Sequence, residues 1–205
     1  MPTPPVTPLA EPAAVSPVQA RLLDALGRAM VEQGLARTTV ADVARLAGTS
    51  KRTFYEHFAT KDDAFLALYA ARSRQLIASI ESVVTDPAAP MEDQVRGGVR
   101  AYLGFLAATP ELARAHMLES HALGRTGLDA RRRLMDTHAA YLRELVERAR
   151  SHHHELRALS EAEAVGVVAG LTELTLRASL DEEPLDGAAH VGATVDFLTT
   201  MLSRR

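Results

Sequence analysis

Seven side chains that can donate a hydrogen bond or carry a positive charge lie between residues 51 and 61. Besides Thr60, they are Lys51, Arg52, Thr53, Tyr55, His57 and Lys61. Lys and Arg bind phosphate oxygens and the O6 and N7 atoms of guanine, while hydroxyl groups bind phosphate. From Arg45 to Lys61 four basic residues face one acidic residue, although the whole chain has a net charge of −3. This pattern favours contact with a nucleic acid.

The spacing around these side chains predicts two short helices joined by a tight turn. Thr39 and Asp42 form a capping-box pattern at the start of the first helix. Gly48 suits the turn, and Ser50 can cap a second helix over residues 50–58. The apolar positions of the first helix recur at helical spacing and are Val40, Val43, Ala44 and Ala47.

Two phenylalanines decide which face of the second helix turns inward. Phe54 and Phe58 are four residues apart and share one face of a helix, so Lys51, Arg52 and Tyr55 project elsewhere. This arrangement is typical of a DNA-reading helix-turn-helix. Short amphipathic helix pairs are common, and the pattern alone is weak evidence for that function.

The order of residues in this stretch resembles a known family. The run Gly48, Ser50, Phe54–Tyr55–x–His57–Phe58 and Lys61 resembles the DNA-binding signature of the TetR family of bacterial repressors. The preceding segment 39–48 resembles the first half of that signature. The resemblance covers residues 20–68, and the remainder is similar to the family only in length and helical character.

The spacing and the resemblance together predict that helix 50–58 enters the major groove. Lys51 and Arg52 would read guanine or hold phosphate, and Lys61 would lie near the DNA backbone. Glu56 departs from the donor-rich surface, because it can only accept hydrogen bonds. The predicted DNA-contacting residues are Thr39, Thr49, Ser50, Lys51, Arg52, Thr53, Tyr55, His57 and Lys61.

Composition bounds the remaining possibilities. The chain has 205 residues, is 47% hydrophobic and contains no cysteine, which excludes disulfides, thiolate metal sites and cysteine nucleophiles. Residues 1–17 hold six of the ten prolines and no basic residue, so we expect a disordered arm. Neither a signal peptide nor a membrane span is expected, and we predict a cytoplasmic protein without cofactor or metal.

Helical periodicity continues to the end of the sequence, and no alternating strand pattern appears. We predict an all-α fold with three parts: the arm 1–17, a helix-turn-helix domain over 18–66 and a larger helical domain over 67–205. The stripe of the helix that starts at residue 61 includes Phe65, Leu68, Arg72, Leu76 and Ile80. The other predicted helices are 18–33, 91–108, 109–122, 127–150, 160–181 and 188–202.

The last two helices are apolar on most sides, and such helices are buried on most sides. A second copy of the chain would supply the cover, as the family resemblance also implies, although both helices could instead be buried inside one chain. The predicted dimer-interface residues are Val168, Leu171, Leu174, Val195, Leu198 and Met201.

The family resemblance implies a ligand pocket in the larger domain. His116 and Glu119 share one helix face and could be pocket groups, a metal pair or an exposed flank. The predicted pocket residues are Tyr102, Phe105, His116, Met117, Glu119, Tyr141, Glu173 and Arg177. Glu173 and Arg177, four residues apart, could instead form an ion pair. The triplet His152, His153 and His154 is interpreted as a solvated loop, because adjacent helical residues do not share a face.

No arrangement of residues argues for catalysis, so we predict a regulator and not an enzyme. The preferred function is a homodimeric repressor that binds a palindromic double-stranded operator and is released by a small-molecule effector of unknown identity. The alternatives are a ligand-independent or activating regulator, and a helical scaffold or enzyme with a chance helix-turn-helix pattern.

Overall fold

The computed structural model describes residues 16–204, except for the side chains of residues 120–122. The chain forms two compact units that meet in sequence at Phe65 and Leu66. The predicted disordered arm lies outside the described residues up to residue 15. Its last residue, Pro17, instead begins a helix, because the Ser16 hydroxyl accepts the backbone N–H of Gln19 at 3.1 Å.

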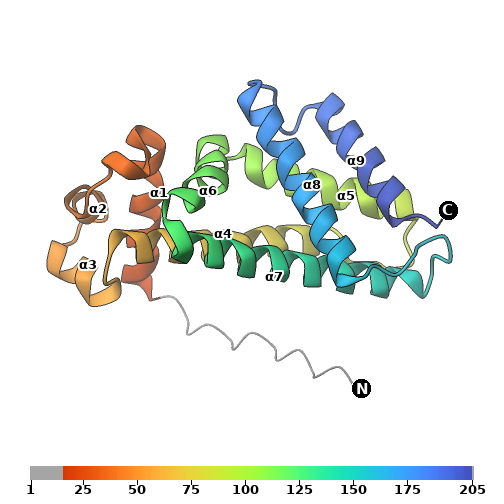
Figure 1. The fold of residues 1–205 in the computed structure, drawn as a ribbon, viewed down its shortest axis with the longest axis horizontal. Helices are drawn as coiled ribbons and strands as arrows, with labels where there is room; N and C mark the ends of the chain where they lie inside the picture. The colour runs from red at the N-terminus through yellow and green to blue at the C-terminus, as the bar shows by residue number, and fades with distance from the viewer. Residues whose placement is uncertain (1–15, 205) are drawn as a thin grey trace, which may run out of the picture. The chain divides into compact units, whose positions relative to one another are not determined.

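The all-helical prediction is confirmed, since the described residues form helices and one isolated β-bridge. The first unit contains α1 (Pro17–Arg37), α2 (Val40–Leu46) and α3 (Lys51–His57), and α4 (Lys61–Glu81) begins in it (Figure 1). Gly34 interrupts α1 with φ of 77°, a left-handed conformation that glycine adopts without steric cost. The predicted helix end at Gly34 corresponds to this break.

The core of the first unit fixes the orientation of α3. Phe54 is fully buried and Phe58 is 5% exposed, with their ring centroids 5.6 Å apart. These rings are buried together with aliphatic side chains such as Leu26 and Val43. Since both phenylalanines face inward, the residues between and beside them are turned outward.

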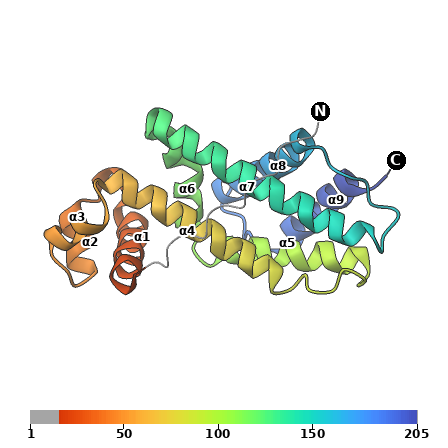
Figure 2. The ribbon, with the colours of Figure 1, turned by 90° about the horizontal axis from the view of Figure 1, so that it is seen from below.

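The second unit contains the rest of α4 and five further helices. They are α5 (Met91–Ala107), α6 (Pro110–Ala122), α7 (Gly124–Arg150), α8 (Glu161–Leu180) and α9 (Ala188–Leu202). Within this unit α8 packs on α7 and on α9, while α9 packs on α5 (Figures 1 and 2). One predicted bound is wrong, since α7 starts at Gly124 rather than 127.

Local capping explains where several of these helices begin. The Thr60 hydroxyl donates to Asp63 at 2.8 Å before α4, and the Ser160 backbone N–H donates to Glu163 at 2.8 Å before α8. Hydrogen bonds from Ser160, and then from Arg157, lower the pKa of Glu163 to about 2. This carboxylate therefore stays ionised and available to the capping box.

The loop between α7 and α8 is joined to the end of α9. Leu156 and Ser203 form an antiparallel bridge, and the backbone N–H of Arg204 donates to the Glu155 carbonyl at 2.8 Å. The Arg157 guanidinium donates to the Met201 carbonyl at 2.9 Å. We call residues 155–157 and 201–204 the terminal bridge.

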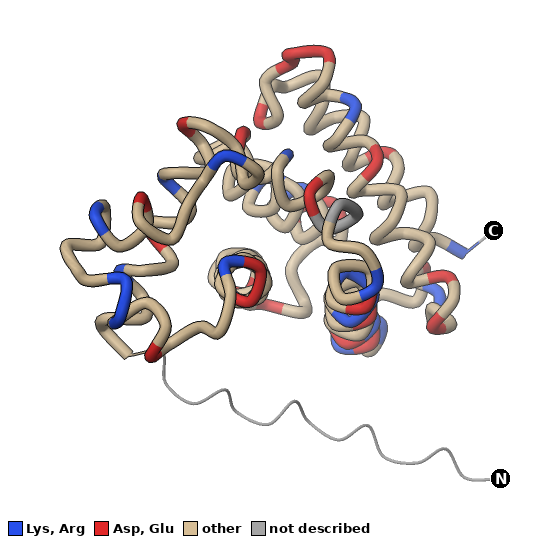
Figure 3. The backbone as a smooth tube through the Cα atoms, turned by 60° about the vertical axis from the view of Figure 1, so that its left-hand side comes forward, with Lys and Arg blue, Asp and Glu red and all other residues tan. Residues whose placement is uncertain are grey.

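Charge is distributed unevenly among the helices of the second unit. Residues of α7 form exposed pairs such as Arg125 with Asp129 and Arg132 with Asp136, whereas α9 has a single charged residue, Asp196 (Figure 3). Despite this apolar character, none of the helices in the described part of the chain is long and apolar enough to span a membrane.

The Phe54 ring should control the stability of the first unit. Phe54→Ala removes a fully buried ring and leaves a cavity, so we expect a loss of roughly 3–5 kcal/mol in the free energy of unfolding of this unit. Tyr55→Ala is the matched control, because its ring is 57% exposed. Circular dichroism melts and amide hydrogen exchange measure both, and equal stability of the two variants would contradict this packing.

Candidate functional site

Three of the predicted DNA-contacting side chains are exposed together on α3. Lys51 and Arg52 lie in its first turn, and Tyr55 follows one turn later with 57% of its surface exposed. Thr53 and His57 are half-buried. The buried Phe54 and Phe58 rings hold this helix from behind, so the two cations and the phenol form one polar face.

Arg52 is paired on this face, but the pairing is weak. Its Nε atom lies 3.2 Å from Oε1 of Glu56, and the two side chains are 89% and 55% exposed. Ion pairs this exposed contribute little stability because water screens them. A phosphate or a guanine edge can therefore replace Glu56 at small cost, so the acidic residue does not prevent DNA contact.

The hydroxyl groups near α2 and α3 act mainly as caps. Thr39 donates to Asp42 at 2.6 Å, and the hydrogen bonds of Thr39 lower the pKa of that carboxyl group. The Ser50 hydroxyl accepts the backbone N–H of Thr53 at 3.1 Å. The Thr49 hydroxyl is buried and bonds no atom of the described residues. Thr39 and Ser50 thus position the two helix starts more than they present free donors.

Lys61 has a contact that the sequence analysis missed. Its ammonium group donates to the backbone carbonyls of Leu35 at 2.6 Å and of Thr38 at 2.9 Å. An ammonium group has three donors, so one remains for another acceptor. Lys61 thus holds the end of α1 against the start of α4, and any phosphate contact would add to this structural role.

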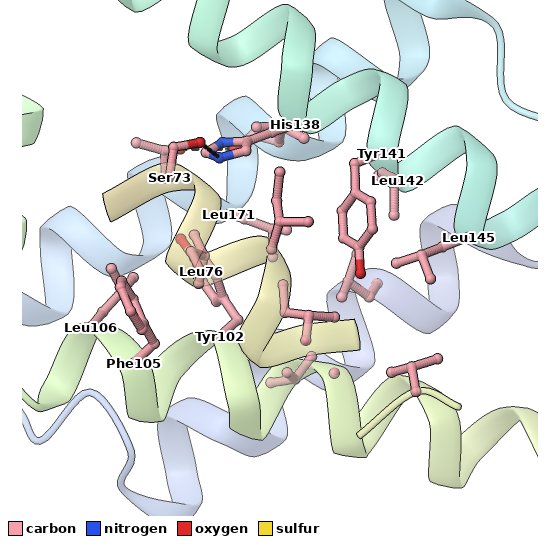
Figure 4. Close-up of a pocket in the computed structure, with 18 of the residues that line it drawn as sticks. Ser73, Leu76, Tyr102, Phe105, Leu106, His138, Tyr141, Leu142, Leu145 and Leu171 are labelled. Atoms are coloured by element: carbon pink, nitrogen blue, oxygen red, sulfur yellow. Dashed lines mark hydrogen bonds between the residues drawn. The ribbon is translucent and has the colours of Figure 1, made fainter. Parts of the chain in front are cut away.

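A cavity of about 240 Å³ lies inside the second unit. Side chains from all six of its helices, α4 to α9, line it, and most are aliphatic or aromatic (Figure 4). Its volume exceeds the roughly 150 Å³ of an apolar cavity that binds benzene. Neither aspartate nor glutamate is among its lining residues.

Several polar groups of the cavity are paired within the chain. Ser73 and His138 share a hydrogen bond of 2.7 Å (Figure 4). The Tyr102 hydroxyl lies 3.1 Å from that of Thr175. Burial lowers the pKa of His138 to about 4 and raises that of Tyr102 to about 12. Both side chains are therefore neutral at physiological pH.

Arg72 is the main cation of this cavity. It donates to the Thr109 hydroxyl at 2.8 Å, and its guanidinium carbon lies 4.6 Å from the centroid of the Phe105 ring. Desolvation lowers its pKa, yet arginine remains charged in proteins. Burial and then the charge of Arg72 lower the pKa of His116 to about 3, and the His116 ring lies 4.7 Å from that of Tyr69.

Five of the eight predicted pocket residues line the cavity: Tyr102, Phe105, His116, Met117 and Tyr141. The other three, Glu119, Glu173 and Arg177, are not among its lining residues. Glu173 and Arg177 instead form an exposed ion pair of 2.8 Å on the outer side of α8.

The sequence analysis missed Arg72, Ser73 and His138 as cavity residues. The signal for Arg72 was its place at helical spacing between Leu68 and Leu76, on a stripe that is otherwise apolar. No comparable signal marked the other two.

The six predicted dimer-interface residues have different environments in the single chain. Val168 and Val195 are 8% and 5% exposed within core clusters, and Leu171 and Leu198 line the cavity. Leu174 and Met201 are half-buried. The exposed positions on α8 and α9 include small residues: Gly166, Ala169, Ala189 and Ala193.

The interpretation of the histidine triplet as a solvated loop is wrong for His153. Its side chain is 12% exposed, and its Nε2 atom lies 2.9 Å from the Ala89 carbonyl and 3.2 Å from Nε2 of Gln94. His152 and His154 are exposed loop residues. His153 thus ties the loop after α7 to the loop before α5, a long-range contact that local sequence cannot indicate.

As for metals, no three His, Asp or Glu side chains of the described residues converge as ligands.

The comparison with protein families identifies one segment. Residues 22–68 match the family of bacterial regulatory proteins described as the tetR family. The HTH-type transcriptional regulator TtgR of Pseudomonas putida is 42% identical over 50 residues. ArpR, a probable HTH-type transcriptional regulator of Pseudomonas putida, is equally similar. The match spans 24% of this chain and 24% of each relative's length.

Solved structures resemble the chain over most of its length. The fatty acid degradation regulator FadR from Bacillus halodurans has a TM-score of 0.77 and 20% identity, over 93% of this chain and 98% of that one. FadR from Bacillus subtilis, in complex with stearoyl-CoA, has a TM-score of 0.74 and 17% identity, over 89% and 98%. These likenesses extend the shared fold from the helix-turn-helix to the second unit.

The neutral His138 should make the stability of the chain depend on pH. Its folded pKa of about 4 lies below its unfolded value of 6.5, so the unfolded chain binds the extra proton between these values. The free energy of unfolding should therefore fall as pH decreases from about 6.5 to 4, by at most about 1.4 kcal/mol per pH unit for this residue. Denaturant titrations across this range measure the slope.

His138→Gln should make that slope smaller. It should change the free energy of unfolding near pH 8 less than it changes the slope, because His138 is neutral in both the folded and the unfolded chain at that pH. The exposed His152 supplies the control, because His152→Gln should keep the parent slope. If both variants keep the parent slope, His138 is not held neutral by burial.

Proposed function

We propose that this chain, which belongs to the TetR family of bacterial regulatory proteins, is a DNA-binding transcriptional repressor. Its first unit would read an operator through α3, and the cavity of its second unit would receive a small-molecule effector. Binding of the effector would release the protein from DNA. The observation that carries this proposal is the exposure of Lys51, Arg52 and Tyr55 on one face of a helix fixed by the buried Phe54.

The chemistry of that face suits the major groove. A helix fits this groove, Arg and Lys bind the O6 and N7 atoms of guanine, and hydroxyls bind phosphate. Arg52 would exchange its exposed partner Glu56 for a DNA acceptor. Lys61 would hold α1 and α4 together and offer its remaining N–H to a phosphate, next to the start of α4.

Support for an effector comes from the cavity. It is enclosed by apolar side chains and is large enough for a small ligand. Bacillus subtilis FadR, which is similar in fold, was solved with stearoyl-CoA. A long apolar molecule would fit the lining here as well. Such a ligand can release DNA only if it binds the DNA-free arrangement more tightly than the DNA-bound one.

A homodimer would form through the outer faces of α8 and α9. Exposed Gly166, Ala169 and Ala193 would allow two copies to approach closely, and α9 has only one charged residue. Half-buried Leu174 and Met201 would add apolar area. Because dimeric helix-turn-helix proteins bind two half-sites, the operator is expected to be palindromic.

Substitutions on α3 test the DNA-reading role. Lys51→Ala and Arg52→Ala should each weaken operator binding, and loss of a base contact costs roughly 1–3 kcal/mol on the true site while hardly changing binding to random DNA. Loss of a phosphate contact would instead weaken both and lower the salt slope by about one unit. Affinities for selected operator and random duplexes at several salt concentrations distinguish the two.

The control is Arg132→Ala, which removes one positive charge from a side chain of α7 that is 82% exposed. It should leave the affinity for the operator unchanged. If folded Lys51→Ala and Arg52→Ala bind the operator as the parent does, α3 is not the reading helix and the proposed function fails.

A charge on α8 tests the dimer. Ala169→Glu places a carboxylate where the proposed interface excludes water, and an unpaired buried charge is strongly unfavourable. Sedimentation should therefore show monomers. The variant should still fold, because Ala169 is exposed in the single chain and a larger side chain there displaces no neighbour. Ala140→Glu, on an exposed position of the charged helix α7, should remain dimeric. Intact dimers of Ala169→Glu would place the interface elsewhere.

A further inference from the structure

The polar groups of the cavity are concentrated toward one end. Tyr69 and Arg72 lie near the middle of α4, and Arg131 lies in the first third of α7. Burial raises the pKa of Tyr69, and the charge of Arg131 opposes this shift. His116 stacks beside Tyr69 and feels the charge of Arg72. Both cations therefore lie close to the same pair of aromatic rings.

The described residues place no anion beside the charge at this end. The ion pairs formed by residues 16–204 include neither Arg72 nor Arg131, and no carboxylate lines the cavity. A partly desolvated cation without an anion is costly. An anionic group of a ligand would supply the missing partner, and arginine binds carboxylates with two parallel hydrogen bonds.

The other end of the cavity is apolar. It is formed where α4 ends, where α5 begins and where the terminal bridge joins the loop to α9, by Val84, Met91, Val146, Leu156 and Leu202. An extended hydrocarbon chain suits this lining, since burial of apolar surface is favourable. The two ends together fit an amphipathic anion.

Tyr141 lies between these ends and differs from the other polar groups of the cavity. Its hydroxyl is buried and bonds no donor or acceptor of the described residues, and burial raises its pKa to about 12. Figure 4 shows its ring projecting from α7 among lining side chains, with the hydroxyl directed away from the Ser73–His138 bond. A buried hydroxyl without a partner costs about 1–3 kcal/mol, so a partner is expected when the cavity is filled.

The other polar groups that could meet a ligand beyond the cations, including Gln94 near the apolar end, are already bonded in the chain. Tyr102 bonds Thr175, the Thr172 hydroxyl donates to the Val168 carbonyl, and Gln94 donates to the carbonyls of Pro87 and Ala89. Tyr141 therefore stands out as a hydroxyl of the cavity that has no partner among the described residues.

We infer that the effector is an amphipathic anion whose acidic group binds Arg72 and Arg131 and whose chain carries an oxygen atom that bonds Tyr141. Arg131 and Tyr141 are ten residues apart on α7, so their Cα atoms are separated by roughly 15 Å along the helix axis. The oxygen would lie well along the chain rather than beside the acid. This inference rests on the proposed effector role of the cavity.

Calorimetric titration with dodecanoate and a series of hydroxydodecanoates tests it. The hydroxyl is placed near the carboxylate, at mid-chain or at the far end. The parent should bind one of the latter two isomers about five-fold more tightly than dodecanoate, the gain expected from one net hydrogen bond. Tyr141→Phe should abolish this preference and bind dodecanoate at least as well as the parent does.

Tyr102→Phe is the matched control, since it removes a hydroxyl of the same cavity that already has a protein partner. It should keep the preference of the parent, and thermal melts of both variants verify folding. If no isomer is preferred by the parent, or if the preference survives in Tyr141→Phe, Tyr141 does not read the ligand and its hydroxyl is satisfied by water.

The binding of the acidic group by Arg72 is tested by comparing dodecanoate with dodecanol, which has the same chain and no charge. Arg72→Gln should weaken dodecanoate about ten-fold or more, as expected for a charge-assisted hydrogen bond, and leave dodecanol binding unchanged. Equal losses for both ligands, or no loss for either, would overturn the assignment of the anion to Arg72. Arg131→Gln should follow the same pattern.

Operator binding separates this inference from the proposed function. If the parent binds an operator and dodecanoate releases it without any hydroxyl preference, the function stands and only the reading by Tyr141 is wrong. If the parent binds no DNA selectively, the repressor proposal fails, while the calorimetric comparison still decides which molecules the cavity binds.

Discussion

The second unit is organised around one costly group, the guanidinium of Arg72. It lies beside an apolar cavity, where a cation loses hydration that no carboxylate of the lining replaces. The protein compensates in part through the Phe105 ring and the Thr109 hydroxyl. Burial and then the same charge keep His116 neutral, so the proposed binding of an anion would not depend on histidine protonation near neutral pH.

In the first unit the constraint is different. A short helix must hold its polar side chains on the outside of the unit. The α3 helix has seven residues, Lys51–His57, and would be marginal alone. Its stability comes from the buried Phe54 and from the Ser50 cap. The cations of its outer face therefore depend on a ring that makes no DNA contact itself.

The sequence predicted the first unit well and the cavity only in part. Caps such as Thr39 with Asp42 and apolar spacing such as Phe54 with Phe58 act within one turn, so local residues determine them. The cavity brings together residues from helices far apart in sequence. Periodicity could not tell that Glu173 and Arg177 face solvent, that Val168 packs inside the chain, or that Arg72 turns inward with the apolar stripe of α4.

The terminal bridge has a consequence for the order of folding. Leu156 pairs with Ser203 across a separation that spans both α8 and α9, so the contact is strongly non-local and its loop-closure entropy must be overcome first. During synthesis, helices α4 to α8 emerge before the last turn of α9 can close this end. The apolar part of the cavity is thus open in every shorter nascent chain. An aggregation-prone surface would be exposed at this end of the second unit.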